Sequence, residues 1–325
     1  MTTPAVSVCV PVYRGEQFLA ETIHSVLEQT YRDFELVILD NASPDDSGRI
    51  ARSFRDDRIR VETNSSVLPQ PHNWRRAVEL CRAPLIKLVC ADDLLHPRCL
   101  ELQAVLMNLD RSVAVVAARC HMIDESSRVI VRNRGLVGLR THVDVARRVV
   151  RSASNPIGDP GGVLFRREHY DAVGGWNPER SFAMDLDLWL RLLRHGDFLG
   201  RSESLAATRI SRSSLTAQNA STIDQHQSAV TDELIGTAGL DIRLRDRLVG
   251  RINTPLNRQR RRLLYVLAGL AARRDALFSR STSATAARPN SGDTTSEGDN
   301  RGVVPRHRAA DIWAAERPDD ARVID

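Results

Sequence analysis

Lysine is almost absent from this chain of 325 residues: Lys87 is the only one, and the other 45 of its 46 basic residues are arginines. With 41 acidic residues, the formal net charge is +5. Such an arginine bias usually reflects a GC-rich coding sequence. No helix-turn-helix, zinc-finger or aromatic-and-basic pattern accompanies it, so we expect no nucleic-acid partner.

Long apolar runs and paired cysteines are missing as well. No stretch approaches the roughly 18–20 uncharged apolar residues that span a bilayer, and Met1–Ala5 lacks a signal-peptide pattern. The five cysteines are odd in number and have no CxxC spacing, which argues against a disulfide framework and a structural zinc site. We therefore expect a cytoplasmic protein with reduced, mostly buried thiols.

Two nucleotide-binding motifs are also absent. No GxGxxG follows the first apolar segment, which argues against a dinucleotide-binding site, and no GxxxxGK[ST] occurs, which excludes a standard phosphate loop. Hydride transfer and P-loop ATP hydrolysis are therefore not expected.

Short apolar segments rich in β-branched residues alternate with segments of helical spacing between residues 6 and 118. The predicted strands are Val6–Val10, Phe34–Leu39, Leu85–Val89 and Val113–Ala118, and the predicted helices are Phe18–Leu27, Ser47–Phe54, Asn73–Leu80 and Pro97–Leu109. Because the strands are continuously apolar, the pattern predicts an α/β fold with a parallel sheet covered by helices on both faces. Ligands of such sheets bind beyond the carboxyl ends of the strands.

Acidic residues follow two of these strands. Asp92 and Asp93 end the third strand, where a buried acid pair is costly without a cation, so they hold a divalent metal or else cap the next helix. Asp40 ends the second strand. It either accepts hydrogen bonds from a base or ribose or serves the turn formed with Asn41 and Ser43.

A second pair of acids, Asp185 and Asp187, opens an amphipathic helix that ends near His195. Either carboxylate can be the helix N-cap, or a general base if it is held rigidly and partly desolvated. Lys87 and Arg98 flank the first acid pair, and each is a phosphate contact or an ordinary packing or solvent residue.

A resemblance to a known family rests on three segments: VSVCVPVYRGEQFLAETIHSVLEQTYRDFELVILDNASPDDS, then KLVCADDLLHP, then GGWNP followed by AMDLDLWLRLLRHG. In this order, over roughly residues 5–218, the chain resembles an inverting family 2 glycosyltransferase of the GT-A fold. The resemblance implies a mostly parallel nucleotide-binding sheet. It also implies sugar transfer from a nucleotide-diphosphate sugar to an acceptor hydroxyl, in polysaccharide, glycolipid or glycoconjugate biosynthesis.

The same resemblance implies roles for individual residues. Asp93 would be the ligand of a divalent metal, Mn²⁺ or Mg²⁺. Met184 to Trp189 matches the family's Glu-Asp-x-Asp-Leu-Trp motif, which makes Asp185 the implied catalytic base. Asp187, Lys87 and Arg98 are additional candidate site residues, the last two as phosphate contacts. The implied nucleotide-binding residues are Pro11, Val12, Tyr13, Glu16, Asp40 and Asp92.

Three positions depart from the family pattern. Cys90 stands where many relatives have a further acid, Met184 replaces a glutamate, and Ser211 replaces the histidine of an Arg-x-His-x-x-Ser-x-Thr element. They motivate an alternative from another class: a nucleotide-sugar-binding protein without turnover, in a scaffolding or regulatory role. The retained acids at the four main site positions favour the enzyme.

The chain divides into a glycosyltransferase-like domain at 1–218, a helical extension at 219–280 and a tail at 281–325 whose composition predicts disorder. Arg258–Ala272 can form an amphipathic helix. It either lies on an anionic membrane, at the inner face and near a lipid-linked acceptor, or packs against the protein.

Overall fold

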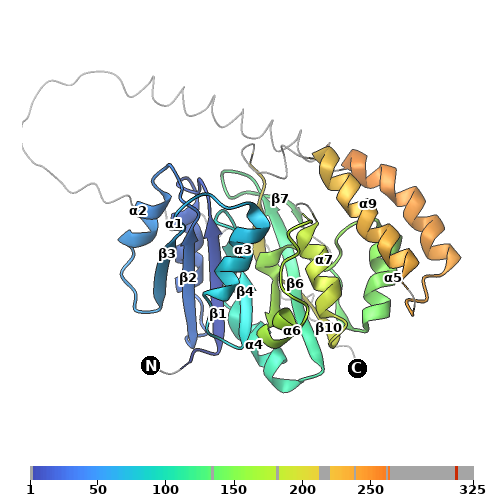
Figure 1. Cartoon of the computed structure of the whole chain (residues 1–325), viewed down its shortest axis with the longest axis horizontal. Helices are drawn as coiled ribbons and strands as arrows, with labels where there is room; N and C mark the ends of the chain where they lie inside the picture. The colour runs from blue at the N-terminus through green and yellow to red at the C-terminus, as the bar shows by residue number, and fades with distance from the viewer. Residues whose placement is uncertain are drawn as a thin grey trace, which may run out of the picture.

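The computed structural model describes residues 3–132, 135–180, 183–211, 220–237, 239–260, 263 and 312–313. Within them, one sheet of ten strands runs in the order β3-β2-β1-β4-β9-β6-β10-β5, with β7 paired to β6 and β8 paired to β10 (Figure 1). The strands are β1 Val6–Val12, β2 Phe34–Asp40, β3 Ile59–Thr63, β4 Leu85–Leu88, β5 Leu94–Leu95, β6 Val113–Ile123, β7 Val129–Arg132, β8 Gly138–Arg140, β9 Val163–Arg166 and β10 Asp197–Arg209.

Helices cover both faces of this sheet. They are α1 Leu19–Leu27, α2 Ser47–Ser53, α3 Gln70–Glu79, α4 Cys99–Leu109, α5 His142–Ser152, α6 Arg167–Ala172, α7 Met184–Leu192 and α9 Ala220–Gly236, with a 3-10 turn, η1, at Pro160–Gly162. The apolar sides of α1 and α4 join one core cluster, and those of α3, α5 and α7 join the other. Figure 1 shows α3 and α7 in front of the sheet.

The α/β fold with helices on both faces is confirmed. Strands β3, β2, β1 and β4 are parallel, and every residue of β1 and β2 is buried, as their continuous apolar sequences indicate. The other half of the sheet is mixed, because β9 runs antiparallel between β4 and β6. The carboxyl ends of β1, β2 and β4 share one edge, so the loops that follow these strands meet there.

The cysteines lie where the sequence places them. Cys9, Cys81, Cys99 and Cys120 are buried and Cys90 is half-buried, so the expectation of mostly buried thiols is confirmed. Across the described ranges, no helix is both long and apolar enough to cross a bilayer.

The described residues after 219 are mainly helical. After α9, a second helix covers residues 244–260, and Leu263 is also helical. The rest of the predicted helical region up to residue 280, and most of Arg258–Ala272, lie outside the described residues. So does the tail at 281–325, apart from Ile312 and Trp313, which pack against the sheet near Leu94 and Ile123.

Candidate functional site

Asp92 and Asp93 lie between β4 and β5, at the carboxyl end of β4. Asp93 is only 2% exposed; its Oδ1 accepts a hydrogen bond from the backbone N–H of Arg209 at 3.1 Å, and its Oδ2 has no partner among the described residues. Burial raises the pKa of Asp93 well above its usual range, and the charges of Asp92 and Asp159 add to this effect. The capping alternative is wrong, because Arg98 is the N-cap residue of α4 and no side chain caps that helix.

Arg209, at the end of β10, holds this acidic turn in place. Its guanidinium is fully buried; Nε donates to the Asp92 carbonyl at 3.0 Å, and Nη2 forms an ion pair with Glu21 at 2.9 Å. The same group stacks over the ring of Phe18, 4.2 Å from its centroid. Arg209 is the first residue of the element in which Ser211 replaces the family's histidine. It therefore contacts the Asp92-Asp93 turn through both its backbone and its side chain.

A third acid, Asp159, joins the two predicted acid groups. It precedes η1, and its Oδ2 accepts a hydrogen bond from the hydroxyl of Thr208 at 3.0 Å. Burial raises the pKa of Asp159, and its charge in turn raises the pKa of both Asp93 and Asp185. A Cβ on Gly161 would lie 3.7 Å from Asp93 Oδ2, so the η1 backbone packs directly against that carboxylate.

Asp185 lies in the first turn of α7 and is half-buried. Its Oδ2 accepts a hydrogen bond from the side-chain amide of Asn155 at 2.9 Å. Burial, followed by the charge of Asp159, raises the pKa of Asp185 to about 6. The N-cap alternative is wrong for both acids of this helix, because Ala183 occupies that position in a left-handed conformation and no side chain caps the helix.

Asp187, two residues further on, is in a different environment. It is 8% exposed, and its Oδ2 accepts hydrogen bonds from Nε and Nη2 of Arg191 at 2.9 and 2.7 Å. Arg191 also donates to the carbonyls of Val173 and Gly175. Asp187 is thus one half of an ion pair that fastens α7 to the preceding loop.

Asp40 ends β2 and is 5% exposed. Its Oδ1 accepts the backbone N–H of Ser43 at 3.0 Å, so part of its hydrogen-bonding capacity serves the turn. A Cβ on Gly48 would lie 2.8 Å from its Oδ2, which means that only glycine leaves room for the carboxylate here. Asn41 is a structural residue, because its side chain bonds both backbone groups of Leu68.

The nucleotide-binding residues that the family resemblance implies at the end of β1 differ in their exposure. Pro11 and Val12 are buried within the strand, whereas Tyr13 is 44% exposed at its carboxyl end. Glu16 is exposed, and its backbone N–H donates to Asp45 Oδ2 at 3.1 Å. The loops after β1 and β2 are therefore bonded together at the same edge as Asp40.

Lys87 and Arg98 lie away from this group of acids. Lys87 is fully buried, and its Nζ donates to Gln103 Oε1 at 2.7 Å and to the Val163 carbonyl at 3.3 Å. Arg98 is exposed and pairs with Glu101 at 3.3 Å. Neither contacts an acid of the site among the described residues, and their role as phosphate contacts stays a prediction.

A metal ion fits this site only with additional ligands. Within the described ranges, no group of three or more His, Cys, Asp or Glu residues could hold a metal by itself. Asp93 Oδ2 is nevertheless a buried carboxylate oxygen without a partner in the part of the chain that the structure describes, and Mg²⁺ or Mn²⁺ usually keeps waters and substrate phosphates in its shell. The residues present thus fit a cation whose remaining ligands come from a diphosphate and water.

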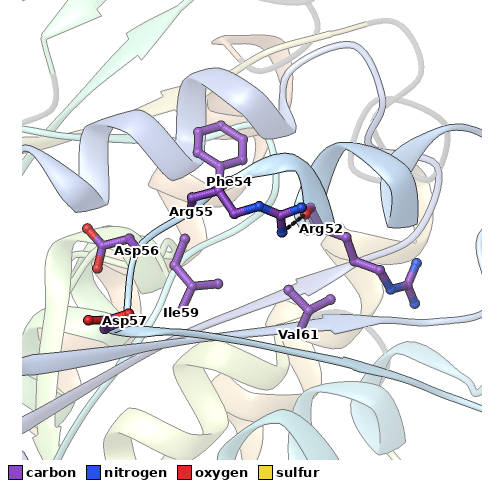
Figure 2. A pocket seen from close by; sticks show the side chains of 8 residues that line it. Arg52, Phe54, Arg55, Asp56, Asp57, Ile59 and Val61 are labelled. Atoms are coloured by element: carbon purple, nitrogen blue, oxygen red, sulfur yellow. Dashed lines mark hydrogen bonds between the residues drawn. The ribbon is translucent and has the colours of Figure 1, made fainter.

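A separate hollow of about 530 Å³ lies beside α2 and β3 (Figure 2). It is lined by side chains that include Phe54, Arg55, Ile59 and Val61. None of the acids described above lines it, and it is formed largely by the amino end of β3 and the loop before it. The hollow is therefore distinct from the acidic edge.

The acid-bearing edge of a half-parallel α/β sheet is the arrangement of the GT-A class of nucleotide-sugar-binding folds. The family model for glycosyl transferase family 2 matches residues 7–174, and the chain belongs to that family. An uncharacterized protein of Mycobacterium tuberculosis is 32% identical over 200 residues, which cover 58% of this chain and 62% of that protein. The putative glycosyltransferase EpsE of Bacillus subtilis is 29% identical over 198 residues, or 59% and 68% of the two chains. The match thus spans less than two thirds of the mycobacterial relative.

Solved structures share the fold. The mannosyltransferase PcManGT from Pyrobaculum calidifontis, in complex with GDP-Man and Mn²⁺, has a TM-score of 0.56 and 17% identity, over 89% of this chain and 82% of that one. TarS of S. aureus in complex with UDP-GlcNAc has a TM-score of 0.55 and 15% identity, over 77% and 79%. The GT-A fold expected from the sequence is confirmed.

Proposed function

We propose that this chain transfers a sugar from a nucleotide-diphosphate sugar to an acceptor hydroxyl with inversion at the anomeric carbon. One observation supports the proposal: the loop at residues 155–161 contacts both acid groups, because Asn155 donates to Asp185 Oδ2 at 2.9 Å and a Cβ on Gly161 would lie 3.7 Å from Asp93 Oδ2. The two acid groups, which are almost a hundred residues apart in sequence, therefore belong to one cluster. An inverting transfer needs this combination, with a base on the acceptor side and neutralised diphosphate on the other.

Asp185 is the proposed general base. A pKa of about 6 leaves its carboxylate ionised at neutral pH, yet basic enough to accept a proton from an acceptor hydroxyl. Asn155 fixes the orientation of the carboxylate through its amide N–H. The hydroxyl, once it gives up its proton to Asp185, attacks the anomeric carbon in line with the departing nucleoside diphosphate.

The donor is proposed to bind at the edge formed by the loops after β1, β2 and β4. Asp93 would hold Mn²⁺ or Mg²⁺, which when bound supplies positive charge to the diphosphate. Asp40 and Asp92 are proposed to contact the nucleoside, together with the loop formed by Pro11, Val12, Tyr13 and Glu16. The complexes of PcManGT with GDP-Man and Mn²⁺ and of TarS with UDP-GlcNAc support a donor of this chemical class.

Calorimetric titration with UDP, GDP and dTDP, with and without Mn²⁺, tests the donor site. We expect one nucleotide to bind, Mn²⁺ to strengthen its binding at least about tenfold, and Asp93→Asn to lose this gain. Asp171→Asn, an exposed aspartate on α6, is the matched control and should behave as wild type. Failure of all three nucleotides to bind would contradict the proposal.

The second candidate, a nucleotide-sugar-binding protein without turnover, differs in one measurement. The enzyme should release nucleoside diphosphate from the donor, slowly by hydrolysis and faster when an acceptor is present. Asp185→Asn should bind the donor as tightly as wild type but release no nucleoside diphosphate. Wild type that binds the donor and keeps it intact with every acceptor offered would favour the second candidate.

A further inference from the structure

The helix at 244–260 packs against the protein through its polar side. Asn253 donates its side-chain amide to the Arg151 carbonyl at 2.7 Å, and Asn257 donates to the Ala153 carbonyl at 3.1 Å. These carbonyls belong to the C-terminal end of α5, whose last turn has no intrahelical donors for them. Asp246, 1% exposed, forms an ion pair with Arg151 at 2.8 Å.

The backbone of this helix also lies close to the backbone of α5, on the side that faces the protein. A Cβ on Gly250 would lie 2.3 Å from the Val150 carbonyl, so the helix approaches α5 at a distance that only glycine permits. Figure 1 shows the helix, in orange, at the edge of the molecule beside α9 and α5. Polar and small residues therefore form the side of this helix that packs against the protein, where an ordinary amphipathic helix has apolar residues.

The apolar residues of the same helix face outward. Ile252 is 65% exposed and Leu248 is 51% exposed, although both are large aliphatic side chains. At 100° per residue, the exposed apolar positions fall within an arc of about 140°, opposite Asp246, Gly250 and Asn253. We call them the outer face: Leu244, Leu248, Val249, Ile252, Leu256 and Leu263.

The positive charge of the chain is concentrated in the sequence segment that carries this face. Residues 241–263 contain eight arginines and two aspartates, out of 46 basic and 41 acidic residues in all. The other 302 residues therefore hold 38 basic and 39 acidic residues, which nearly cancel. Arg245, Arg251 and Arg258 are exposed on the helix, while Asp246 is buried in its ion pair.

Three partners could cover the outer face: residues 264–325 of the same chain, a second copy of the chain, or a lipid surface. Their charges distinguish them. Residues 264–325 contain nine arginines and nine acidic residues, so this part of the chain offers no net negative charge to match it. A second copy would bring an equally basic face and repel the first. An anionic lipid surface complements both features, because acyl chains accept the apolar side chains and headgroup phosphates accept the arginines.

We propose that the outer face docks the protein on an anionic lipid bilayer, with the helix lying in the membrane plane. The apolar side chains enter the boundary between headgroups and acyl chains, and the flanking arginines contact lipid phosphates. The sequence indicates an amphipathic helix at Arg258–Ala272 that contacts either a membrane or the protein, whereas the surface derived from the structure begins at Leu244. This inference does not depend on the proposed function.

Flotation of the full chain with phosphatidylcholine vesicles, with and without phosphatidylglycerol, tests the docking. We expect binding to the anionic vesicles that weakens at high salt, and little binding to phosphatidylcholine alone. Combined replacement of Leu248, Ile252 and Leu256 by Gln should reduce binding at least about tenfold. The matched control replaces three exposed apolar residues elsewhere by Gln and should bind as wild type: Val67, Val105 and Leu109.

Two further readouts separate the other occupants. If residues 264–325 cover the outer face, the triple Gln variant should melt several degrees lower than wild type; an unchanged melting temperature supports a free face. If a second copy covers it, wild type should be a dimer in light scattering and the variant a monomer. Either result, or no binding of wild type to anionic vesicles at low salt, overturns the proposal. Nucleotide titration without lipid checks the donor site separately.

Discussion

Asp93 accepts a hydrogen bond from the backbone N–H of Arg209 at 3.1 Å through Oδ1, and its Oδ2 stays without a partner among the described residues. Arg209 therefore orients the carboxylate through its backbone, while its guanidinium bonds Glu21 and the carbonyls of Asp92 and Asp124 and offsets the charge of Asp93 only in part. A buried carboxylate oxygen in this state is costly in isolation. The arrangement is what a site needs if it receives its cation together with the donor.

Replacing Arg209 by methionine should release this turn. The carbonyls of Asp92 and Asp124, which are part-buried and buried, lose their donor, and Glu21, which is 32% exposed, loses its cation. We expect the free energy of unfolding to fall by about 3 kcal/mol in urea denaturation. Glu21→Gln keeps the shape of the network and should cost less. Unchanged nucleotide affinity in folded Arg209→Met would contradict the positioning role.

Asp185→Asn should make the protein more stable and inactive. The pKa of Asp185 is about 6 in the folded protein and 3.8 as the ordinary value, so between these values the folded state binds more protons and stability falls as pH rises. Above pH 6 this cost is fully present, and asparagine removes it. Thermal unfolding at pH 7 should show a gain of about 2 kcal/mol, which disappears near pH 4. Equal stabilities at both pH values would contradict the raised pKa.

Two neighbours of Asp185 should shift the pH dependence of kcat/KM in opposite directions. The charge of Asp159 raises the pKa of Asp185, and the hydrogen bond from Asn155 lowers it. Asp159→Asn should therefore move the acid limb of the profile below pH 6, and Asn155→Ala should move it above. Asp171→Asn should leave the limb in place. Shifts in the same direction would mean that the two variants act through general loosening of the site.

The first half of the fold could be predicted because its strands are buried on both faces and its helices are amphipathic. The strands at Val6, Phe34, Leu85 and Val113 begin where their apolar runs begin. The sequence pattern does not predict the edge strand β3, because this strand is half-buried and its polar residues interrupt the apolar run. The direction of β9 is set by long-range pairing with β4 and β6, which a local pattern does not contain.

The site was predicted less completely than the fold. Asp93 and Asp185 stand in recognisable motifs, and one loop contacts both acids, because Asn155 bonds Asp185 and Gly161 packs against Asp93. Asn155 and Asp159 each precede a proline in a loop, where both residue types are common for turn-forming reasons alone. Only the tertiary structure shows that the loop returns these side chains to the acids. The same holds for Arg209, whose contacts with Glu21 and Asp93 cross much of the chain.

Gly48→Ala tests the proposed role of Asp40 in donor binding without replacing Asp40 itself. The new methyl group would lie 2.8 Å from Asp40 Oδ2 and should push that carboxylate aside. Alanine also favours a helix over glycine by about 1 kcal/mol, which offsets much of the strain. We expect donor nucleotide affinity to fall about tenfold in calorimetry, with little change in melting temperature. Gly236→Ala, which meets nothing within 4 Å, is the control; equal affinities in both would remove Asp40 from the site.

Lys87→Met separates packing from phosphate binding. Burial lowers the pKa of Lys87 below 10.5, so in the interval below that value the unfolded chain binds a proton that the folded chain does not. Stability of the wild type should therefore rise as the pH increases toward 10.5, and methionine, which fills a similar volume, should abolish this rise. Donor affinity should stay within about twofold of wild type, because Nζ bonds Gln103 and Val163 inside the core. A large loss of nucleotide affinity, with the pH-dependent rise in stability retained, would place Lys87 at the donor site.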